Sequence, residues 1–192
     1  MTISAEDDAT PDAELVGRVR AGDTDAYAVL VRRHAPMAIR TAVLLGAGSD
    51  AEDVVQEALV KAYRSLGSFR TDRPFRPWLL RIVANEARNA HRSAVRRVGR
   101  EARDAGPLLA ELLDPSAALV DREDRERLLA AVARLPDKLG HVVACRYLLE
   151  LDEAATAVVL GVPRGTVKSR LSRGLARLRD DLATTIEEVD HA

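Results

Sequence analysis

The stretch Gly161-Val-Pro-Arg-Gly-Thr-Val-Lys-Ser-Arg-Leu-Ser-Arg-Gly-Leu-Ala-Arg-Leu-Arg179 decides the fold of this 192-residue chain. Its first three residues predict a tight turn, because glycine adopts the positive backbone angle that such turns need and proline readily begins a helix. Residues 151–160 precede this turn as a short apolar helix. After the turn, apolar side chains recur at helical spacing, at Val167, Leu171, Leu175, Leu178 and Leu182. The two segments together predict a helix-turn-helix over residues 151–180, with Arg164–Arg179 as its second helix.

The other face of the second helix is polar and basic. Residues 161–179 carry six basic side chains and no acidic one, whereas ordinary solvated helix surfaces mix both signs. In DNA-binding helices of this kind, the N-terminal half meets base edges and basic flanks hold phosphates. The pattern therefore favours DNA binding over a plain amphipathic helix in a bundle. The expected base contacts are Lys168, Ser169, Ser172 and Arg173, and the expected phosphate contacts are Arg164, Arg170 and Arg177.

The rest of the chain predicts an all-α protein built as two small helical domains. Aromatic residues make up only 3%, so the core must consist of Leu, Val and Ala, and no stretch alternates as a strand does. Ser49-Asp50-Ala51-Glu52 has the form of a capping box at the start of an amphipathic helix. We expect a tail (1–11), a first domain (12–105), a linker (106–124), a second domain (125–185) and a C-terminal tail (186–192).

Composition excludes several classes of protein. The single cysteine, Cys145, rules out an internal disulfide and indicates a reducing compartment. No apolar run approaches the length of a membrane span, and the acidic start is unlike a signal peptide. We therefore expect a cytoplasmic protein. His141 and Cys145 lie one helical turn apart but lack further ligands, so a metal enzyme is disfavoured, and we expect no metal and no cofactor.

A second basic block covers residues 61–105, which carry 12 basic and 4 acidic side chains. Within it, Phe69, Phe75 and Trp78 are interleaved with arginines in a segment that Pro74 and Pro77 predict to be a loop over 69–78. Aromatic rings and cations together suit unstacked single-stranded bases. The same rings can equally form a local core, and the residues alone do not decide between the two.

Several segments resemble the extracytoplasmic-function (ECF, group 4) sigma factors of the sigma-70 family. Asp53-Val-Val-Gln-Glu57-Ala-Leu-Val-Lys-Ala-Tyr63, Phe69-Arg-Thr-Asp72 and Trp78-Leu-Leu-Arg-Ile-Val-Ala-Asn85 are similar to the second conserved region of that family. Leu135-Pro136 and the stretch 161–179 are similar to its fourth region. The match keeps the family's order and spacing across most of residues 12–185.

The resemblance implies a dissociable, non-enzymatic initiation subunit of bacterial RNA polymerase. It implies that core polymerase, promoter DNA and an anti-sigma factor are partners, with no membrane insertion. Asp53, Gln56 and Glu57 would dock on the clamp helices of the β′ subunit. The unstacked −10 element would be captured by Phe69, Arg70, Asp72, Phe75, Trp78, Asn85 and Arg88. The −35 element would be read by Lys168, Ser169, Ser172 and Arg173, with Arg146 on a phosphate ahead of them, and the linker would thread through polymerase.

The chain departs from the family at two positions, and two other functions remain as alternatives. Thr156 stands where isoleucine is common, and Gly140 stands where arginine is frequent. A homodimeric helix-turn-helix regulator would explain residues 151–180, but it gives no role to Asp53–Glu57 or Phe69–Trp78. A helical adaptor for acidic proteins is disfavoured by a reading helix without carboxylates.

Overall fold

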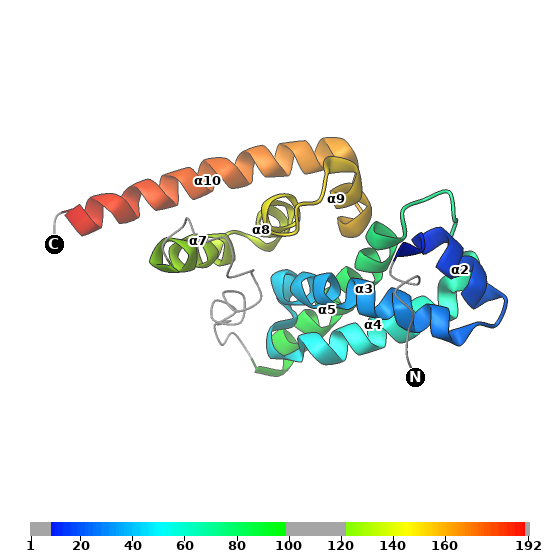
Figure 1. Ribbon diagram of the computed structural model, residues 1–192. Coiled ribbons are helices and arrows are strands. Elements are labelled where there is room, and N and C mark those ends of the chain that lie inside the picture. Colours follow the sequence, from blue (N-terminus) through cyan, green and yellow to red (C-terminus); the bar gives the residue numbers. More distant parts are fainter. Residues whose placement is uncertain (1–8, 99–121, 191–192) are drawn as a thin grey trace.

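The computed structural model describes residues 9–98 and 122–190, and every regular element in these two ranges is helical, as predicted (Figure 1). The first lobe is built from residues 12–98. Its elements are α2 (Asp12–Arg20), α3 (Thr24–Ala42), the π-helical turn η1 (Val43–Ala47), the 3-10 turn η2 (Gly48–Asp50), α4 (Ala51–Ser65), the 3-10 turn η3 (Leu66–Ser68) and α5 (Phe75–Val98).

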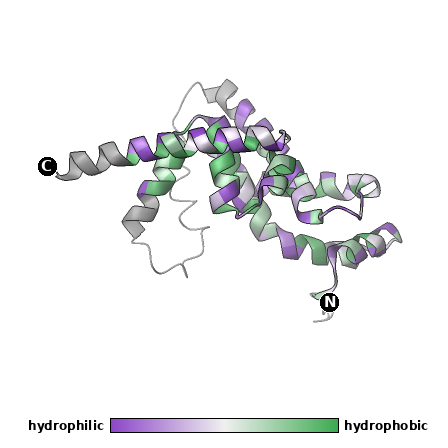
Figure 2. Cartoon of the chain, turned by 90° about the horizontal axis from the view of Figure 1, so that it is seen from above, coloured by the Kyte–Doolittle hydropathy of each residue, from purple (hydrophilic) through white to green (hydrophobic). Residues whose placement is uncertain are grey.

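The second lobe begins at residue 122, three residues inside the predicted linker, whose residues 106–121 lie outside the described ranges. Its elements are α7 (Arg122–Arg134), α8 (Asp137–Val143), the π-helical turn η4 (Ala144–Leu148), α9 (Glu153–Leu160) and α10 (Arg164–Asp190). In Figure 1, α10 runs along one edge of the molecule, with α7 and α8 beneath it and α9 at its beginning. Figure 2 shows hydrophilic and hydrophobic residues interspersed along α10, as an amphipathic helix requires.

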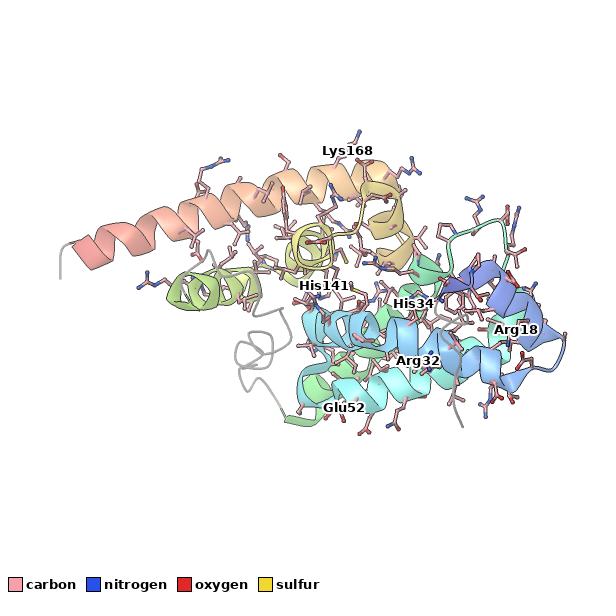
Figure 3. All side chains as sticks on the ribbon, viewed as in Figure 1. Arg18, Arg32, His34, Glu52, His141 and Lys168 are labelled. Atoms are coloured by element: carbon pink, nitrogen blue, oxygen red, sulfur yellow. The ribbon has the colours of Figure 1, made fainter. Side chains whose placement is uncertain are left out.

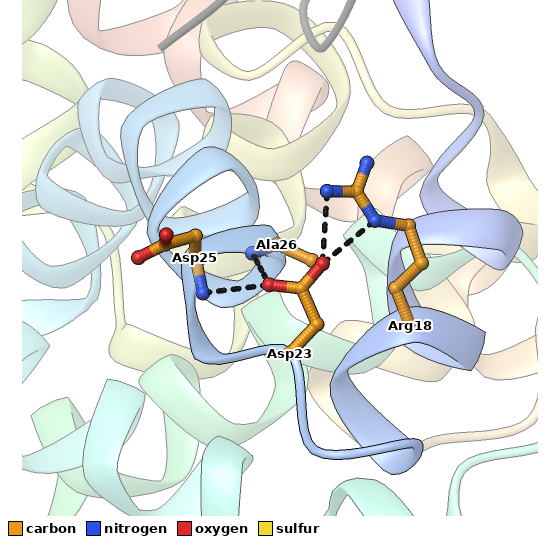
Figure 4. A network of polar contacts seen from close by, with 4 residues as sticks. All are labelled: Arg18, Asp23, Asp25 and Ala26. Atoms are coloured by element: carbon orange, nitrogen blue, oxygen red, sulfur yellow. Dashed lines mark hydrogen bonds and ion pairs between the residues drawn. The ribbon is translucent and has the colours of Figure 1, made fainter. Parts of the chain in front are cut away.

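The start of α3 shows how local chemistry fixes these helices. Asp23 is the N-cap, and its Oδ1 accepts the backbone N–H groups of Asp25 and Ala26 at 3.0 and 3.2 Å (Figure 4). Arg18 donates from Nε to the other oxygen at 2.9 Å, which ties the end of α2 to the start of α3. A capping carboxylate satisfies N–H groups that have no acceptor inside the helix.

Two local predictions were wrong. The capping box at Ser49 does not form: the 3-10 turn η2 leads into α4, and the Ser49 hydroxyl lies 3.5 Å from Oδ1 of Asp50 instead. The segment 69–78 is also not a loop throughout, because α5 begins at Phe75. Pro77 is tolerated as the third residue of α5, since an N–H in the first turn has no intrahelical acceptor.

The two lobes share one apolar core. Buried residues of α5, including Ala84 and Ala87, belong to the same cluster as Val159 and Leu160 of α9. A second cluster lies among α2, α3, α4 and α5, and a small third one lies between α7, α8 and α10. The predicted domains therefore pack directly on each other through α5 and α9. None of the helices in the described ranges has the length and apolar character needed to cross a membrane.

Candidate nucleic-acid interface

The helix-turn-helix forms where the sequence predicted it. Asp152 caps α9 by accepting the N–H of Ala155 at 2.6 Å. Gly161 then takes the left-handed conformation, with φ 67° and ψ 39°, which the turn requires. The N–H of Val162 donates to the carbonyl of Ala157 at 3.1 Å, and the half-buried Val162 side chain packs against the core. The turn residues therefore set the angle between α9 and α10.

Close packing on α8 determines which face of α10 is exposed. Val167 and Leu178 are buried, and Gly174 between them is buried as well. A Cβ at Gly174 would lie 2.9 Å from Cγ2 of Val143, closer than real Cβ atoms approach. Because α10 lies so near α8 along its apolar side, its polar side points outward.

The four predicted base-contacting residues all lie on this exposed side. Figure 3 shows Lys168 extending away from the body of the molecule. Its Nζ lies 3.9 Å from a carboxylate oxygen of Glu153 on α9, a neighbour that sequence reasoning missed. Arg173 donates from Nε to the carbonyl of Ser169 at 3.2 Å, and the Ser169 hydroxyl donates to the carbonyl of Thr166 at 3.2 Å. One continuous polar surface, which we call the reading face, is formed by the four predicted base-contacting residues Lys168, Ser169, Ser172 and Arg173.

The predicted phosphate contacts divide into two kinds. Arg164 and Arg177 are exposed and Arg170 is half-buried, all on the flanks of the reading face. Arg146 is half-buried in η4, and its Nη1 donates to the carbonyl of Leu151. Arg146 therefore supports the turn between η4 and α9, a contact that its sequence position did not reveal.

The aromatic residues of the first lobe pack on one another. Phe69 and Phe75 are each only 4% exposed, and their ring centroids lie 5.5 Å apart. Trp78 is half-buried, with centroids 5.0 Å from Phe69 and 5.4 Å from Phe75. The phenylalanines thus belong to the local core, and Trp78 is the ring at its edge.

Charged side chains lie at the tip of the loop between η3 and α5. Arg70 donates to both carboxylate oxygens of Asp72, from Nε at 3.1 Å and from Nη2 at 2.8 Å. The hydrogen bonds from Arg70 lower the pKa of Asp72. Both residues are exposed, so this pair presents one cation and one anion next to the aromatic cluster.

Of the predicted −10 contacts on α5, Arg88 faces the second lobe and Asn85 is exposed beside it. Arg88 donates from Nη2 to Oδ1 of Asn85 at 2.7 Å and from Nη1 to the carbonyl of Leu160 at 3.3 Å. Burial, followed by the charge of Arg92, lowers the pKa of Arg88. The end of α9 therefore binds the Arg88 side chain and leaves Asn85 exposed.

Two more arginines of the first lobe make the same kind of contact. Arg40 donates to the carbonyl of Leu148 at 3.1 Å, and Arg76 donates to the carbonyl of Leu149 at 3.2 Å. The last carbonyls of a helix lack intrahelical donors and carry partial negative charge. Arg40, Arg76 and Arg88 satisfy such groups at the ends of η4 and α9. We refer to these contacts as the interlobe arginine contacts.

The outward face of α4 combines acidic and apolar groups. Asp53, Gln56 and Glu57 are exposed, as expected, and Lys61 pairs with Glu57 at 2.9 Å. Val60 is 49% exposed and Tyr63 is 45% exposed. Sequence reasoning did not place Val60 or Tyr63 on this face. The 53, 56, 57 and 60 spacing was the signal that should have grouped Val60 with the acidic face.

Of the two family departures, Gly140 has a structural reason and Thr156 has none. Gly140 is buried on α8, where a Cβ would lie 3.2 Å from the carbonyl oxygen of Val132 on α7. An arginine there requires α7 and α8 to separate. Thr156 is fully buried on α9, and its hydroxyl has no hydrogen-bond partner among the described residues.

No cluster of three or more potential metal ligands occurs among the residues that the structure describes. His141 and Cys145 are not joined there by a further ligand. Burial raises the pKa of the Cys145 thiol to about 12, so the thiolate that binds metals is disfavoured.

Comparisons with known proteins agree with the two-lobed division. Residues 30–97 match the family profile of Sigma-70 region 2, and residues 125–178 match that of Sigma-70, region 4. The ECF RNA polymerase sigma-E factor of Escherichia coli (strain K12) is 34% identical over 170 residues, which cover 84% of this chain and 89% of the relative. The ECF RNA polymerase sigma factor SigW of Bacillus subtilis (strain 168) is 31% identical over 176 residues, which cover 87% and 94%.

Two solved structures share the fold. CnrH, solved in complex with the cytosolic domain of CnrY, superposes with a TM-score of 0.68 at 28% identity, covering 90% of this chain and 97% of CnrH. The sigma factor RpoE of Bartonella quintana, solved with the anti-sigma factor NepR, gives a TM-score of 0.63 at 23% identity, covering 80% and 94%.

Proposed function

The chain belongs to the extracytoplasmic-function sigma factors of RNA polymerase, and from this premise we propose how its own residues select a promoter. As a transcription initiation factor, it acts together with core polymerase. It supplies no catalytic group of its own and works in the cytoplasm, where core polymerase and the chromosome are. The observation that carries the proposal is a pair of separate exposed surfaces: the reading face on α10 of the second lobe, and the Arg70–Asp72 pair beside Trp78 on the first.

The reading face of α10 enters the major groove of the −35 element. Lys168, Ser169, Ser172 and Arg173 are exposed on the N-terminal half of α10, the half that meets base edges in helix-turn-helix proteins. Arginine matches the two acceptors of guanine, and the serines accept or donate. Arg164, Arg170 and Arg177 lie beside them and hold phosphates. Arg146 orients the turn before α9 and reaches a phosphate only with its remaining N–H groups.

The loop between η3 and α5 captures the unstacked −10 strand. Trp78 offers a half-buried ring for stacking, while Phe69 and Phe75 form the floor beneath it. Arg70 and Asp72 provide hydrogen-bonding groups at the edge of that floor. Asn85 extends this surface along α5, and Arg88 joins it once α9 has moved away.

The outward face of α4 docks on the β′ clamp helices. Asp53, Gln56 and Glu57 give it polar and acidic character, and the exposed Val60 and Tyr63 add apolar area toward the C-terminal end of α4. A mixed surface of this kind, with an aromatic residue beside charged ones, is typical of protein–protein contacts.

An anti-sigma factor keeps the protein inactive until a signal releases it. The support is at the level of the fold: RpoE, which shares it, was solved bound to the anti-sigma factor NepR. Such a partner needs only to stabilise the packing of α5 against α9, because that packing already engages Arg88.

A reconstitution experiment tests the proposed function. The chain is mixed with sigma-free core polymerase and sheared genomic DNA, and the 5′ ends of the transcripts are mapped. We expect transcripts from a small set of sites with common −35 and −10 sequences. Tight duplex binding without core, and no promoter specificity with core, would instead identify the chain as a regulator that acts from outside polymerase.

A matched pair of variants then tests the reading face. Arg173→Ala removes a base-contacting guanidinium and should lower −35 affinity by about 1–3 kcal/mol. Arg179→Ala removes the same charge from the same helix, but at an exposed position six residues further along. Equal losses in both variants would show that α10 contributes charge alone and reads no sequence.

A further inference from the structure

The loop that carries Arg70 and Asp72 starts from a helix end with unsatisfied carbonyl groups. α4 passes into η3 at Leu66, and Phe69 then turns to an extended conformation, with φ −68° and ψ 135°. The last carbonyls of a helix have no donor within the helix, so another group must satisfy them. In this chain that donor comes from a segment more than 40 residues earlier.

Arg20, the last residue of α2, satisfies these carbonyls. Its Nη2 donates to Leu66 at 2.8 Å, to Gly67 at 3.4 Å and to Phe69, and its Nε donates to Leu66 at 3.2 Å. The planar guanidinium thus spans the whole of η3. Its contact with the Phe69 carbonyl is made at the peptide bond that joins Phe69 to Arg70.

The same helix also forms the floor beneath the loop. Leu15 and Val16 of α2 are fully buried in the cluster that contains Phe69 and Phe75, and Trp78 packs against this cluster. α2 therefore holds the segment from below with apolar contacts and from its start with Arg20. It precedes residues 30–97, the part that matches Sigma-70 region 2, so the match assigns it no role.

We propose that Arg20 is a positioning residue for −10 capture. By fixing the carbonyls of η3 and Phe69, it holds the Arg70–Asp72 pair and Trp78 in their bound arrangement before DNA arrives. Groups ordered in advance lose less conformational entropy on binding, so affinity for the strand rises without a contact from Arg20 itself. This inference rests on the proposed function of the loop.

The first test uses Trp78, the only tryptophan of the chain, as a reporter that needs no polymerase. Arg20→Met keeps most of the apolar stem and removes every donor. We expect its tryptophan emission to shift to longer wavelength and acrylamide quenching to increase, because Trp78 loses its fixed packing on Phe69. Arg64→Met is the control, since Arg64 is exposed at the end of α4 and its loss removes an equal charge.

The second test measures binding by the holoenzyme. The probes are a single-stranded oligonucleotide with the −10 sequence of the promoter most used in the reconstitution, and a duplex with its −35 element. We expect Arg20→Met to weaken binding of the single strand roughly ten-fold, which is the size of effect expected when hydrogen bonds from a charged group are lost. Binding of the duplex should not change. Arg20→Lys should give an intermediate loss, because lysine keeps one charged nitrogen but lacks the second donor, Nε, with which Arg20 also holds the carbonyl of Leu66.

The outcomes separate the inference from the proposed function. Unchanged Trp78 quenching in Arg20→Met, or an equal loss on both probes, would overturn the positioning role. If a thermal melt shows that Arg20→Met does not fold, Arg20→Lys takes its place in the binding test. Wild-type affinity of Arg20→Lys for the single strand would then show that the two-nitrogen geometry of the guanidinium is not required. If the wild-type holoenzyme does not bind the −10 single strand, the proposed function of the loop is refuted. The Trp78 measurement would still report whether Arg20 orders the loop.

Discussion

Arg88 of α5 donates from Nη1 to the carbonyl oxygen of Leu160, the last residue of α9, over 3.3 Å. A carbonyl at a helix C-terminus carries partial negative charge, as a phosphate oxygen does more strongly. The second lobe thus already binds the guanidinium of Arg88, which we assign to promoter DNA. It follows that the packed arrangement of the lobes and capture of the −10 strand compete for the same side chain.

Weakening the interlobe arginine contacts should favour separated lobes. Arg40 is the suitable position, because it contacts Leu148 and is not among the proposed DNA contacts. Arg40→Ala removes one charge-assisted hydrogen bond, although losing the buried Nε, which has no partner among the described residues, offsets part of the effect. We expect a net change of about 1 kcal/mol, hence a roughly five-fold higher ratio of open to closed molecules.

Single-molecule energy transfer measures this ratio. Dyes are attached to cysteines introduced at Glu52 and Ala176, which are exposed on different lobes. Cys145 should not label, because it is buried and its pKa is raised to about 12. Arg64→Ala serves as the charge control. Identical distance distributions in Arg40→Ala and wild type would show that the apolar core alone holds the lobes together.

The helix-turn-helix could be predicted because its determinants are local. Gly161 needs a positive φ, Asp152 caps the helix that follows it, and the apolar stripe of α10 is a periodicity. Each of these signals is written in the sequence within a few residues of its effect. The capping box at Ser49 is also a local signal, but this prediction was wrong, because the 3-10 turn η2 precedes α4 there.

The interlobe arginine contacts and the anchoring of the loop could not be predicted in this way. Their acceptors are backbone carbonyls, such as that of Leu160. Every residue has a backbone carbonyl, so the residue type does not show which of them accepts a hydrogen bond. For Phe69 and Phe75 the difficulty is different, since a core and a stacking surface both use aromatic rings. Only the position of α2, fixed by tertiary packing, shows that these two rings are buried.

Thr156→Val should stabilise the protein. The Thr156 side chain is fully buried, and its hydroxyl has no hydrogen-bond partner among the described residues. Valine has nearly the same shape and needs none, so the free energy of unfolding in urea should rise by about 1 kcal/mol. Thr156→Ser, which keeps the hydroxyl and loses the methyl, should be less stable than wild type. A less stable valine variant would imply an ordered water on the hydroxyl.

Two glycines of α10 should respond in opposite directions to the same substitution. At Gly174 a Cβ would lie 2.9 Å from Cγ2 of Val143, so Gly174→Ala must push α10 away from α8. Overpacking of this kind outweighs the gain in helix propensity, and we expect a loss of about 1 kcal/mol. A Cβ at Gly165 meets nothing within 4 Å, so Gly165→Ala should gain roughly 0.5 kcal/mol. Equal shifts in urea denaturation would contradict the close packing of α10 on α8.

Asp12 should make stability depend on pH in the acid range. Its carboxylate accepts from Arg33 at 2.5 Å and lies 2.9 Å from Nε2 of His34. Burial acts to raise the pKa of Asp12, but the hydrogen bonds and charges of His34 and Arg33 outweigh it, so the pKa lies below the ordinary 3.8. A lowered pKa in the folded state means that the stabilisation is present above pH 3.8 and is lost as the pH falls through the folded value.

Asp12→Asn should therefore be less stable than wild type at pH 7, by about 1–2 kcal/mol, because Arg33 loses a charged acceptor. The difference between the two proteins should shrink steadily below pH 3.8, where Asp12 takes up a proton in the unfolded chain before it does so in the folded one. Urea denaturation at intervals from pH 7 to pH 3 measures both quantities. Asp25→Asn, which neutralises an exposed carboxylate in the first turn of α3, is the control. A wild-type advantage that persists undiminished at pH 3 would mean that Asp12 stabilises the fold by its shape and not by its charge.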